Sequence, residues 1–305
     1  MAHNSTPLTR RRMMAFTLGA ATGSFLSTLP SASAAPAKEK RFGKMRLGLA
    51  TYTWGKDWNV PELIGKLPQA GVFGVELRTS NGWAHGVETT IDATQRREVK
   101  ERFADSPVEL VALACSERMD WPDPARLKSA DEAAKAHIKL SHDVGSRSLR
   151  IFPNNFHKDV PREKTISQIA RAASEVGAYA ADFGQSVDLE AHGPAGELPT
   201  MAAIMEQVTQ PNVRVRLNSD MRDIQGKGFD ANFAMVKNRL AATVHIHNLQ
   251  SEFPYRRQFE LLVRQNWEGW ILMENSEKVP DRLEAIIEQR RIWEETMAGI
   301  MAARR

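Results

Sequence analysis

The chain has 305 residues, of which 42% are apolar and 26% charged, with a formal net charge of +4 and one cysteine, Cys115. This length can bury a large core, and a single cysteine forms no internal disulfide, which excludes the small disulfide-stapled folds. Residues 1–34 contain three arginines and no acidic residue, so the charge falls from +4 to +1 over the remaining 271 residues. Because this charge is near neutral, we expect no nucleic-acid partner.

The N-terminal stretch has the order of a targeting segment. Arginines at positions 10–12 precede a run of apolar and small residues that ends in Ala32-Ser33-Ala34, which fits a small-residue cleavage site. The arginine pair resembles a twin-arginine export signal, with an ordinary secretory signal or an uncleaved anchor as alternatives. We predict a signal peptide over 1–34, a linker over 35–44 and a periplasmic or secreted protein. The apolar run is short and interrupted, so we expect no stable membrane span in the mature chain.

Short apolar segments alternate with longer helical patterns from residue 45 onward. We predict helices within 60–71, 92–106, 129–145 and 166–184, several of which end in glycine, as helix C-termini often do. The eight predicted strands cover residues 47–52, 73–78, 109–115, 148–154, 186–193, 213–218, 243–248 and 270–275. This rhythm is typical of βα units and predicts an α/β fold, a single (β/α)₈ TIM barrel over 45–305. A doubly wound open sheet and an antiparallel sheet with one wet face are the alternatives.

Alternate residues of the predicted strands differ in polarity. One parity is apolar and should pack under the helices: Val75, Leu77, Leu149, Ile151, Val187, Leu189, Val213, Val215, Leu217, Val244, Ile246, Ile271 and Met273. The other parity should face the barrel interior: Glu76, Arg78, Arg150, Asp188, Glu190, Arg214, Arg216, Asn218, His245, His247 and Glu274. Buried charges are costly unless they are paired or bind a metal, so this lining predicts either an ion-pair network or a site.

Four residues of types that bind metal ions fall at the carboxyl ends of consecutive predicted strands, where the active sites of this fold lie. They are Glu190, Asp220, His247 and Glu274. Three carboxylates and one imidazole suit Mn²⁺, Mg²⁺ or Co²⁺ better than a structural zinc ion, which favours cysteine. Salt bridges to the interior arginines are the alternative. His245 shares a strand face with His247 but should lie one layer deeper, as support for the site.

The segments VELR, RSLRIFPN, LEAHG, LNSD, HIHN and MEN resemble the xylose isomerase-like TIM barrels known as sugar phosphate isomerases/epimerases, over essentially residues 45 to 300. The resemblance implies that Glu190, Asp220, His247 and Glu274 bind a divalent metal ion. Mn²⁺ is the first expectation, with Mg²⁺, Co²⁺ or Zn²⁺ as alternatives. It also implies that the two glutamates act as acid and base. In the ketose 3-epimerase branch a histidine commonly follows the strand-six aspartate by three places, and here that place holds Asp223.

Other polar and aromatic side chains are expected to contact the substrate: His85, His192, Arg150, Glu76, Arg256 and Trp54. Glu76 could instead pair with Arg78 as a structural couple, and His192 could instead cap a loop. The last two strands are not followed by a glycine-rich turn that opens a helix, the usual phosphate site of this fold. We therefore expect an unphosphorylated substrate.

The expected reaction is isomerisation or epimerisation of a sugar or keto-sugar, by removal of a proton next to a carbonyl through an enediolate. A lyase that eliminates the aglycone of 3-keto-glycosides and a non-catalytic sugar-binding barrel are the alternatives. A small carbohydrate is the expected partner, and self-association is left open.

Overall fold

The computed structural model describes residues 38–80 and 82–304, so the predicted signal peptide lies outside the described residues. Eight parallel strands form its centre, and each overlaps a strand predicted from the sequence. They are β1 (Met45–Ala50), β2 (Gly74–Arg78), β3 (Glu109–Arg118), β4 (Ser148–Phe152), β5 (Ser186–Glu190), β6 (Val213–Arg216), β7 (Thr243–Ile246) and β8 (Gly269–Met273).

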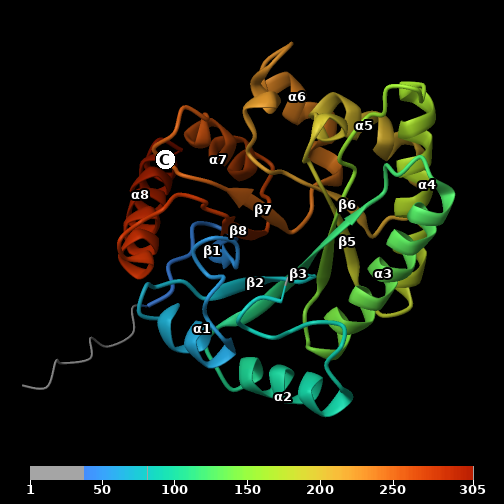
Figure 1. Cartoon of the computed structure of the whole chain (residues 1–305). Coiled ribbons are helices and arrows are strands. Elements are labelled where there is room, and N and C mark those ends of the chain that lie inside the picture. The colour runs from blue at the N-terminus through green and yellow to red at the C-terminus, as the bar shows by residue number, and fades with distance from the viewer. Residues whose placement is uncertain (1–37, 81, 305) are drawn as a thin grey trace, which may run out of the picture. The chain divides into compact units, whose positions relative to one another are not determined.

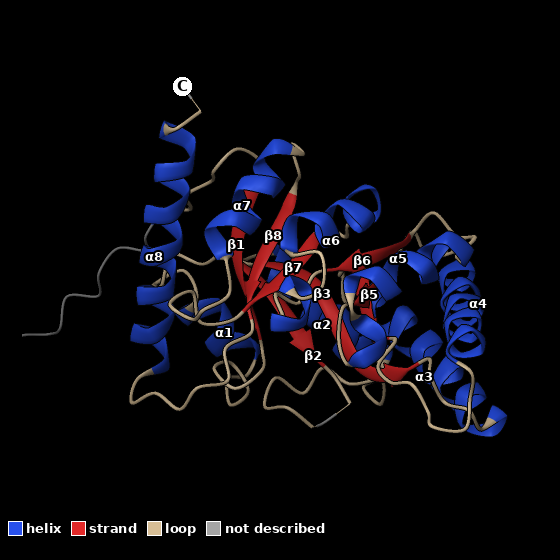
Figure 2. Ribbon diagram, turned by 90° about the horizontal axis from the view of Figure 1, so that it is seen from above, coloured by secondary structure: helices blue, strands red, loops and turns tan. Residues whose placement is uncertain are grey.

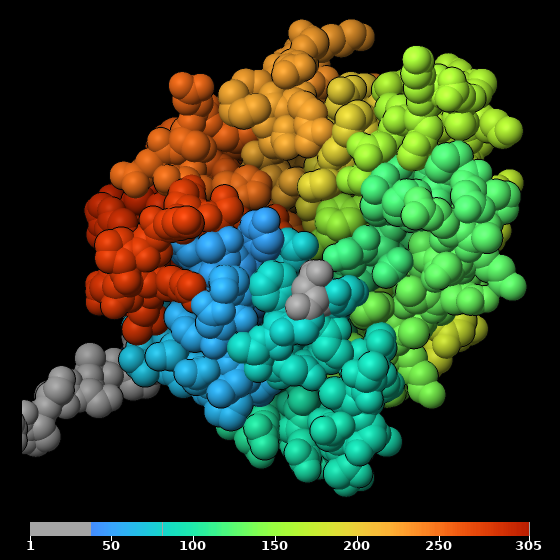
Figure 3. Space-filling view, viewed as in Figure 1, coloured from blue at the N-terminus to red at the C-terminus, as the bar shows by residue number. Residues whose placement is uncertain are grey.

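The strands pair in the order β6-β5-β4-β3-β2-β1-β8-β7. The first and last parts of the described chain lie side by side, because β1 pairs with β8 in parallel (Figures 1 and 3). Between β6 and β7 the contact is thinner: the His245 amide donates to the Leu217 carbonyl at 2.9 Å, and Val215 bridges Leu240. The result is a nearly closed barrel, which confirms the predicted fold class.

Helices surround the strands, as Figure 2 shows. In the described residues they are α1 (Val60–Lys66), α2 (Ala93–Ala104), α3 (Pro124–Asp143), α4 (Arg162–Ala181), α5 (Leu198–Gln207), α6 (Phe229–Val236), α7 (Tyr255–Arg264) and α8 (Arg282–Ala302), with short 3₁₀ turns η1 (Pro194–Gly196), η2 (Met221–Ile224) and η3 (Lys237–Arg239). Local sequence sets several of their starts. Asn59 and Glu62 form a capping box at α1, and Asp92 and Gln95 form one at α2.

The apolar strand parity packs outward, as predicted. All thirteen residues of that set are buried in the main core, which also contains the inner faces of the helices. A smaller apolar cluster fills part of the barrel interior: Ala50, Phe73, Val111, Ala112, Trp270 and Leu272. The Trp270 ring lies where a Cβ at Gly74 would be, so this position accepts only glycine without repacking. This plug supports the polar layer of the interior.

That polar layer is a buried ion-pair network. Arg216 on β6 pairs with Glu76 on β2 and donates from Nη2 to Asp188 Oδ2 on β5 at 2.7 Å. Ser148 and Thr243 donate to the same Asp188 oxygen at 3.1 and 2.7 Å. The network joins five of the strands below their carboxyl ends, so it fixes the relative positions of the strands that carry the site.

None of the helices in the described part of the chain combines the length and apolar character needed to cross a bilayer.

Candidate active site

A cavity of about 480 Å³ opens at the carboxyl ends of the strands. Most of its lining residues are polar, and they come from all eight strands or from the turns that follow them. They are Tyr52, Arg78, Ser116, Arg118, Phe152, Asn154, Glu190, His192, Asn218, Asp220, His247 and Glu274. All four residues predicted as metal ligands are therefore at one cavity.

Three side chains meet within ligand distance of a common point. Glu190 ends β5, His245 lies in β7 and Glu274 directly follows β8, and their ligand atoms all lie within 4.8 Å of one another. His245 Nδ1 is 3.2 Å from Glu274 Oε2 and 3.5 Å from Glu190 Oε2. All three residues are buried. An imidazole and two carboxylates at this spacing can hold either a proton or a divalent cation between them.

The ion-pair network orients His245 from below. Its Nε2 lies 2.8 Å from Glu76 Oε1. Burial would raise the pKa of Glu76, but Arg216 and then His245 lower it to about 2. An ionised Glu76 accepts the Nε2 proton and so leaves Nδ1 directed at the two glutamates, the arrangement that commonly supports a metal-ligating histidine.

Both glutamates of the site are ionised although they are buried. Arg150 Nε lies 3.0 Å from Glu190 Oε2, and Arg78 Nη1 lies 3.3 Å from Glu274 Oε1. Burial would raise the pKa of Glu190, but Arg150 and His245 hold it well below its ordinary value. For Glu274 burial also opposes ionisation, and His245 is the main cause of its lowered pKa. These effects are mutual. Burial would lower the pKa of His245, but the carboxylates of Glu274, Glu76 and Glu190 raise it.

The other two predicted ligands line the cavity but are outside the close group of three. His247 follows the end of β7, and its Nδ1 lies 3.0 Å from the Glu274 carbonyl, which leaves Nε2 for the cavity. Asp220 caps η2 and accepts from the Arg222 side chain at 2.8 and 2.6 Å. Both carboxylate oxygens of Asp220 thus already have a cationic partner. The geometry places His245, expected only as support, closer to Glu190 and Glu274 than these two residues.

Asn218 lines the cavity, and the sequence analysis placed it only among the inward-facing residues. It has the inward parity of Arg216 and lies beyond the end of β6, where it is buried and lines the cavity. Its Oδ1 atom has no hydrogen-bond partner. The parity was the sequence signal for Asn218, whereas Asp220, the more usual type of metal ligand, stays a prediction.

The six predicted substrate contacts separate into two groups. His192 lines the cavity, and burial is the main cause that lowers its pKa. The other five do not line it. The two ring nitrogens of His85 bind backbone, with Nε2 donating to the Arg78 carbonyl and Nδ1 accepting from the Val87 amide, at 2.9 and 3.0 Å.

The remaining four are held away from the cavity surface by other contacts. The Trp54 indole donates to the Glu277 carbonyl at 2.9 Å, and Arg256 on α7 is paired with Glu260 at 3.3 Å. Glu76 belongs to the buried network, where its partners are Arg216 and His245 rather than Arg78. Arg150 is fully buried behind Glu190.

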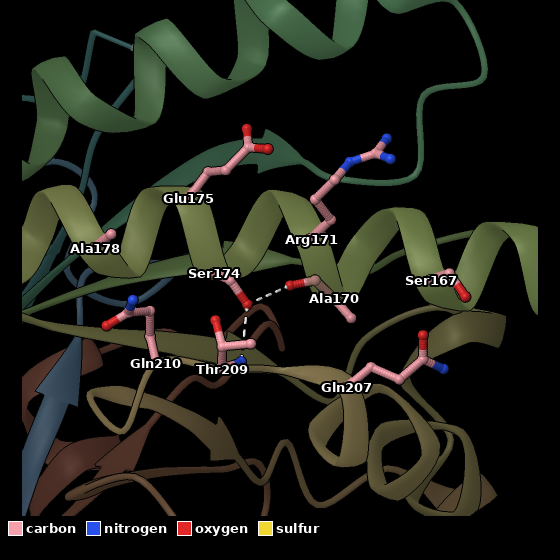
Figure 4. A pocket seen from close by; sticks show the side chains of 9 residues that line it. All are labelled: Ser167, Ala170, Arg171, Ser174, Glu175, Ala178, Gln207, Thr209 and Gln210. Atoms are coloured by element: carbon pink, nitrogen blue, oxygen red, sulfur yellow. Dashed lines mark hydrogen bonds between the residues drawn. The ribbon is translucent and has the colours of Figure 1, made fainter.

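A second hollow, between α4 and the segment that leads into β6, is a poor candidate for chemistry (Figure 4). Its lining is mostly small or neutral. Ser174 Oγ donates to the Ala170 carbonyl at 2.7 Å and accepts from the Thr209 amide at 3.1 Å, so the hydroxyl is already engaged. No histidine accompanies it among the residues that line the hollow.

The residues at the strand ends fit a divalent cation. At this site three buried atoms make no hydrogen bond of good geometry with the described residues, although ion-pair contacts surround two of them: Glu190 Oε2, His245 Nδ1 and Asn218 Oδ1. Unsatisfied buried polar atoms are costly, and a cation between the ligand atoms of Glu190, His245 and Glu274 would satisfy the first two at once. Oxygen and imidazole ligands without thiolate suit Mn²⁺, Mg²⁺, Co²⁺ or a catalytic Zn²⁺.

Comparison with known proteins agrees with this architecture. The family described as xylose isomerase-like TIM barrel matches residues 64–298. No curated protein sequence matches the chain. Among solved structures, an L-ribulose 3-epimerase is similar with a TM-score of 0.71 at 14% identity, over 85% of this chain and 96% of that one.

Two further solved structures are similar at comparable distance. A D-psicose 3-epimerase crystallised in the presence of D-fructose has a TM-score of 0.65 at 14% identity, over 81% of this chain and 89% of that one. A 3-keto-D-glucoside 4-epimerase from E. coli has a TM-score of 0.66 at 13% identity, over 81% and 97%. At these identities the structural likeness establishes the fold.

Proposed function

Because the chain belongs to the xylose isomerase-like TIM barrel family, we propose that it is a metal-dependent sugar isomerase or epimerase. The observation that carries the proposal is the pair of buried, ionised carboxylates Glu190 and Glu274, which face one imidazole at the mouth of the barrel. The similar solved structures named as sugar epimerases support the same class.

The chemistry follows from the two carboxylates. A proton next to a carbonyl leaves more easily when the negative charge that develops on oxygen is stabilised. A divalent cation held by Glu190, Glu274, Asn218 and an imidazole from β7 would supply that stabilisation. One glutamate can remove the proton and the other can return one, either to the opposite face of the same carbon or to its neighbour. The first outcome is epimerisation and the second is isomerisation.

The cavity favours a neutral substrate. A phosphate group needs free cationic or amide donors, and the two arginines in the lining are already paired. Arg78 lies 3.3 Å from Glu274, and Arg118 donates to Asp120 at 3.0 and 2.6 Å. A volume of about 480 Å³ is within the range of small-molecule sites. We therefore propose an unphosphorylated sugar, keto-sugar or keto-glycoside.

A lyase acting on 3-keto-glycosides is the second candidate. The same base would remove the proton next to the keto group, and the glycosidic oxygen would then leave. The likeness to a 3-keto-D-glucoside 4-epimerase makes this substrate class worth including. Mass spectrometry separates the two reactions, because isomerisation conserves mass and elimination releases an aglycone.

Metal binding can be tested without a substrate. Protein stripped with a chelator should gain thermal stability on addition of Mn²⁺, since a ligand that binds only the folded state stabilises it. Glu190→Gln and Glu274→Gln should abolish this gain, whereas Asp220→Asn should retain it if Asn218 is the β6 ligand. Asn218→Asp should tighten binding by replacing a neutral oxygen with a carboxylate. An unchanged midpoint for the wild type with each of the four metals would contradict the metal site.

The histidine ligand can be assigned in the same titration. His245→Gln and His247→Gln should differ, with the larger loss for the residue that contacts the ion and about 10–100-fold for one that only supports it. Because His245 Nδ1 lies 3.5 Å from Glu190 Oε2 and 3.2 Å from Glu274 Oε2, we predict that His245→Gln has the larger effect. The reverse order would restore His247, the residue that the sequence favoured.

Catalysis is then assayed with the metal-loaded protein on a panel of ketoses, their phosphate esters and 3-keto-glucosides. We expect turnover of an unphosphorylated compound. A preference of tenfold or more in kcat/KM for a phosphate ester, about 1.4 kcal/mol of transition-state discrimination, would contradict the proposed substrate class.

A further inference from the structure

We propose that His192 donates a hydrogen bond from Nε2 to a sugar oxygen, and that Asn154 fixes the tautomer that allows this. The proposal rests on the proposed function for the identity of the ligand. The tautomer itself follows from contacts within the chain. Asn154 is a positioning residue, because it acts on the substrate only through His192.

The orientation of the Asn154 amide is set by Arg118. A guanidinium has donors and no acceptor. The amide therefore turns Oδ1 toward Arg118, accepting from Nε at 2.8 Å and Nη2 at 3.3 Å. Its Nδ2 group then faces His192 Nδ1 at 2.9 Å and donates to it.

Arg118 is itself held in place. Its single Nε–H is shared between Asn154 Oδ1 and Asp120 Oδ1, and its Nη2 donates to Asp120 Oδ2 at 2.6 Å. Its guanidinium lies 4.1 Å above the Trp121 ring. Asp120 is buried and also contacts His157 Nε2 at 2.9 Å. The contacts thus run from the Asp120 carboxylate through Arg118 and the Asn154 amide to the His192 imidazole. Arg118 donates to Asn154, and Asn154 donates to His192.

The backbone locks the same pair of loops together. Asn154 adopts a left-handed conformation with φ of 66°, and its carbonyl accepts from the Ala195 amide at 3.0 Å. Gly193 has φ of 70°, and a Cβ there would overlap the Asn154 carbonyl. A non-glycine residue in the left-handed region is uncommon and persists where its surroundings require it. The turn after β4 and the turn after β5 are therefore one rigid unit.

The result is a neutral imidazole with its proton on Nε2. His192 Nδ1 accepts from Asn154, and Nε2 has no hydrogen-bond partner among the described residues although His192 lines the cavity. The ring also packs on Phe152 with centroids 4.6 Å apart. The only free polar atom of the ring is then the Nε2–H group. It can donate to a carbonyl or hydroxyl oxygen, two residues from Glu190 in the sequence.

The test is ¹⁵N NMR of the protein labelled at histidine, without added metal, which reports the protonation of each ring nitrogen and needs no turnover. We expect His192 to be protonated at Nε2 alone. Two other histidines are internal references. His85 accepts at Nδ1 and should show the same tautomer, whereas His137 Nδ1 donates to the Ala133 carbonyl at 2.8 Å and should show the opposite one. A proton on His192 Nδ1 in the wild type would overturn the proposal.

Asn154→Asp is the decisive variant. A carboxylate at this place can only accept, so His192 Nδ1 should become protonated while His85 and His137 keep their tautomers. An unchanged His192 signal in the folded variant would show that Asn154 does not set the tautomer. If Asn154→Asp does not fold, Arg118→Gln removes the group that orients the amide and should give a mixture of the two tautomers. A single Nε2 tautomer in folded Arg118→Gln would count against the mechanism.

The contact with substrate is tested separately by His192→Phe. Its kcat/KM for the preferred sugar should fall about tenfold or more, and the gain of thermal stability with Mn²⁺ should be unchanged. Unaltered kcat/KM would overturn the substrate contact and leave the proposed function standing. If no sugar is turned over by the wild type, the proposed function fails, whereas the tautomer assignment is decided by the spectra alone.

Discussion

Arg216 lies in the charged interior of the barrel, and its removal should destabilise the fold strongly. Its guanidinium is fully buried and pairs with Glu76 and Asp188. Arg216→Met keeps most of the volume but removes the guanidinium from both buried carboxylates, which leaves Glu76 with His245 and Asp188 with two hydroxyl donors. Breaking a buried ion pair from one side costs about 3–5 kcal/mol.

The pKa of Glu76 gives an independent magnitude. It is lowered from 4.5 to about 2, with Arg216 as the largest cause that favours ionisation against burial. At about 1.4 kcal/mol for each pKa unit, ionised Glu76 contributes about 3 kcal/mol at neutral pH. Because the pKa is depressed in the folded state, this contribution is present above pH 4.5 and is lost as the pH falls toward 2.

Urea unfolding at pH 7 of the chelator-treated protein measures the effect, with Arg214→Met as the matched control. Arg214 is on the same strand with the same parity, but it lies at the opposite mouth of the barrel and forms no ion pair with the described residues. We expect a loss of about 3–5 kcal/mol for Arg216→Met and within about 0.5 kcal/mol of wild type for the control. The stability of Arg216→Met should also depend less on pH between 4.5 and 2. Equal stability of the two variants would refute the reasoning.

Three further predictions concern other parts of the chain. Burial raises the pKa of Cys115 to about 12, so the thiol should resist a thiol reagent in the native state and react once per chain in denaturant; rapid native reaction would contradict its burial. Burial lowers the pKa of His137 below 6.5, so its contribution to stability should be present above pH 6.5 and lost as the pH falls; His137→Gln should then lose less stability than wild type between pH 7.5 and 5.5 in urea titrations. Replacing Arg11 and Arg12 by Lys should make the protein accumulate in the cytoplasm on cell fractionation, whereas normal export would favour the ordinary secretory route.

The fold was predictable because two periodicities agree. The alternation of helical and strand patterns indicates βα units, and the alternation of polarity within strands gives the facing of each residue. All thirteen outward residues were correct, and the charged parity does face inward at Glu76, Arg150, Asp188 and Arg216. The sequence left open whether this interior is an ion-pair network or a site. It is a network below the strand ends, and it supports the candidate site above them.

The depth of the site was harder to predict, because it depends on where each strand stops. The sequence predicted β7 through residue 248, but the strand ends at Ile246, so His247 lies in the turn and His245 faces the two glutamates. Strand β6 ends at Arg216. In the turn that follows, Asp220 forms an ion pair with Arg222, and Asn218 lines the cavity. These outcomes depend on strand register and turn geometry, to which side-chain periodicity is insensitive.

The contacts around His192 were beyond sequence reasoning for a related reason. Asn154, Arg118 and Asp120 come from the ends of two strands, and nothing in their spacing relates them to a histidine after β5. A single left-handed residue, Asn154, brings the two turns together. Such a conformation is set by tertiary packing and leaves no periodic signal.

Proton transfer by Glu190 and Glu274 is the central claim, and solvent deuterium tests it most directly. The metal-loaded protein is incubated in D₂O with the sugar that it converts, and the recovered substrate and product are examined by NMR. We expect deuterium at one carbon next to the carbonyl, and a loss of this exchange by at least 100-fold, within the usual range for acid–base catalysis, in Glu190→Gln and in Glu274→Gln. Product that forms without deuterium, or exchange that persists in both variants, would contradict the assignment of these two carboxylates.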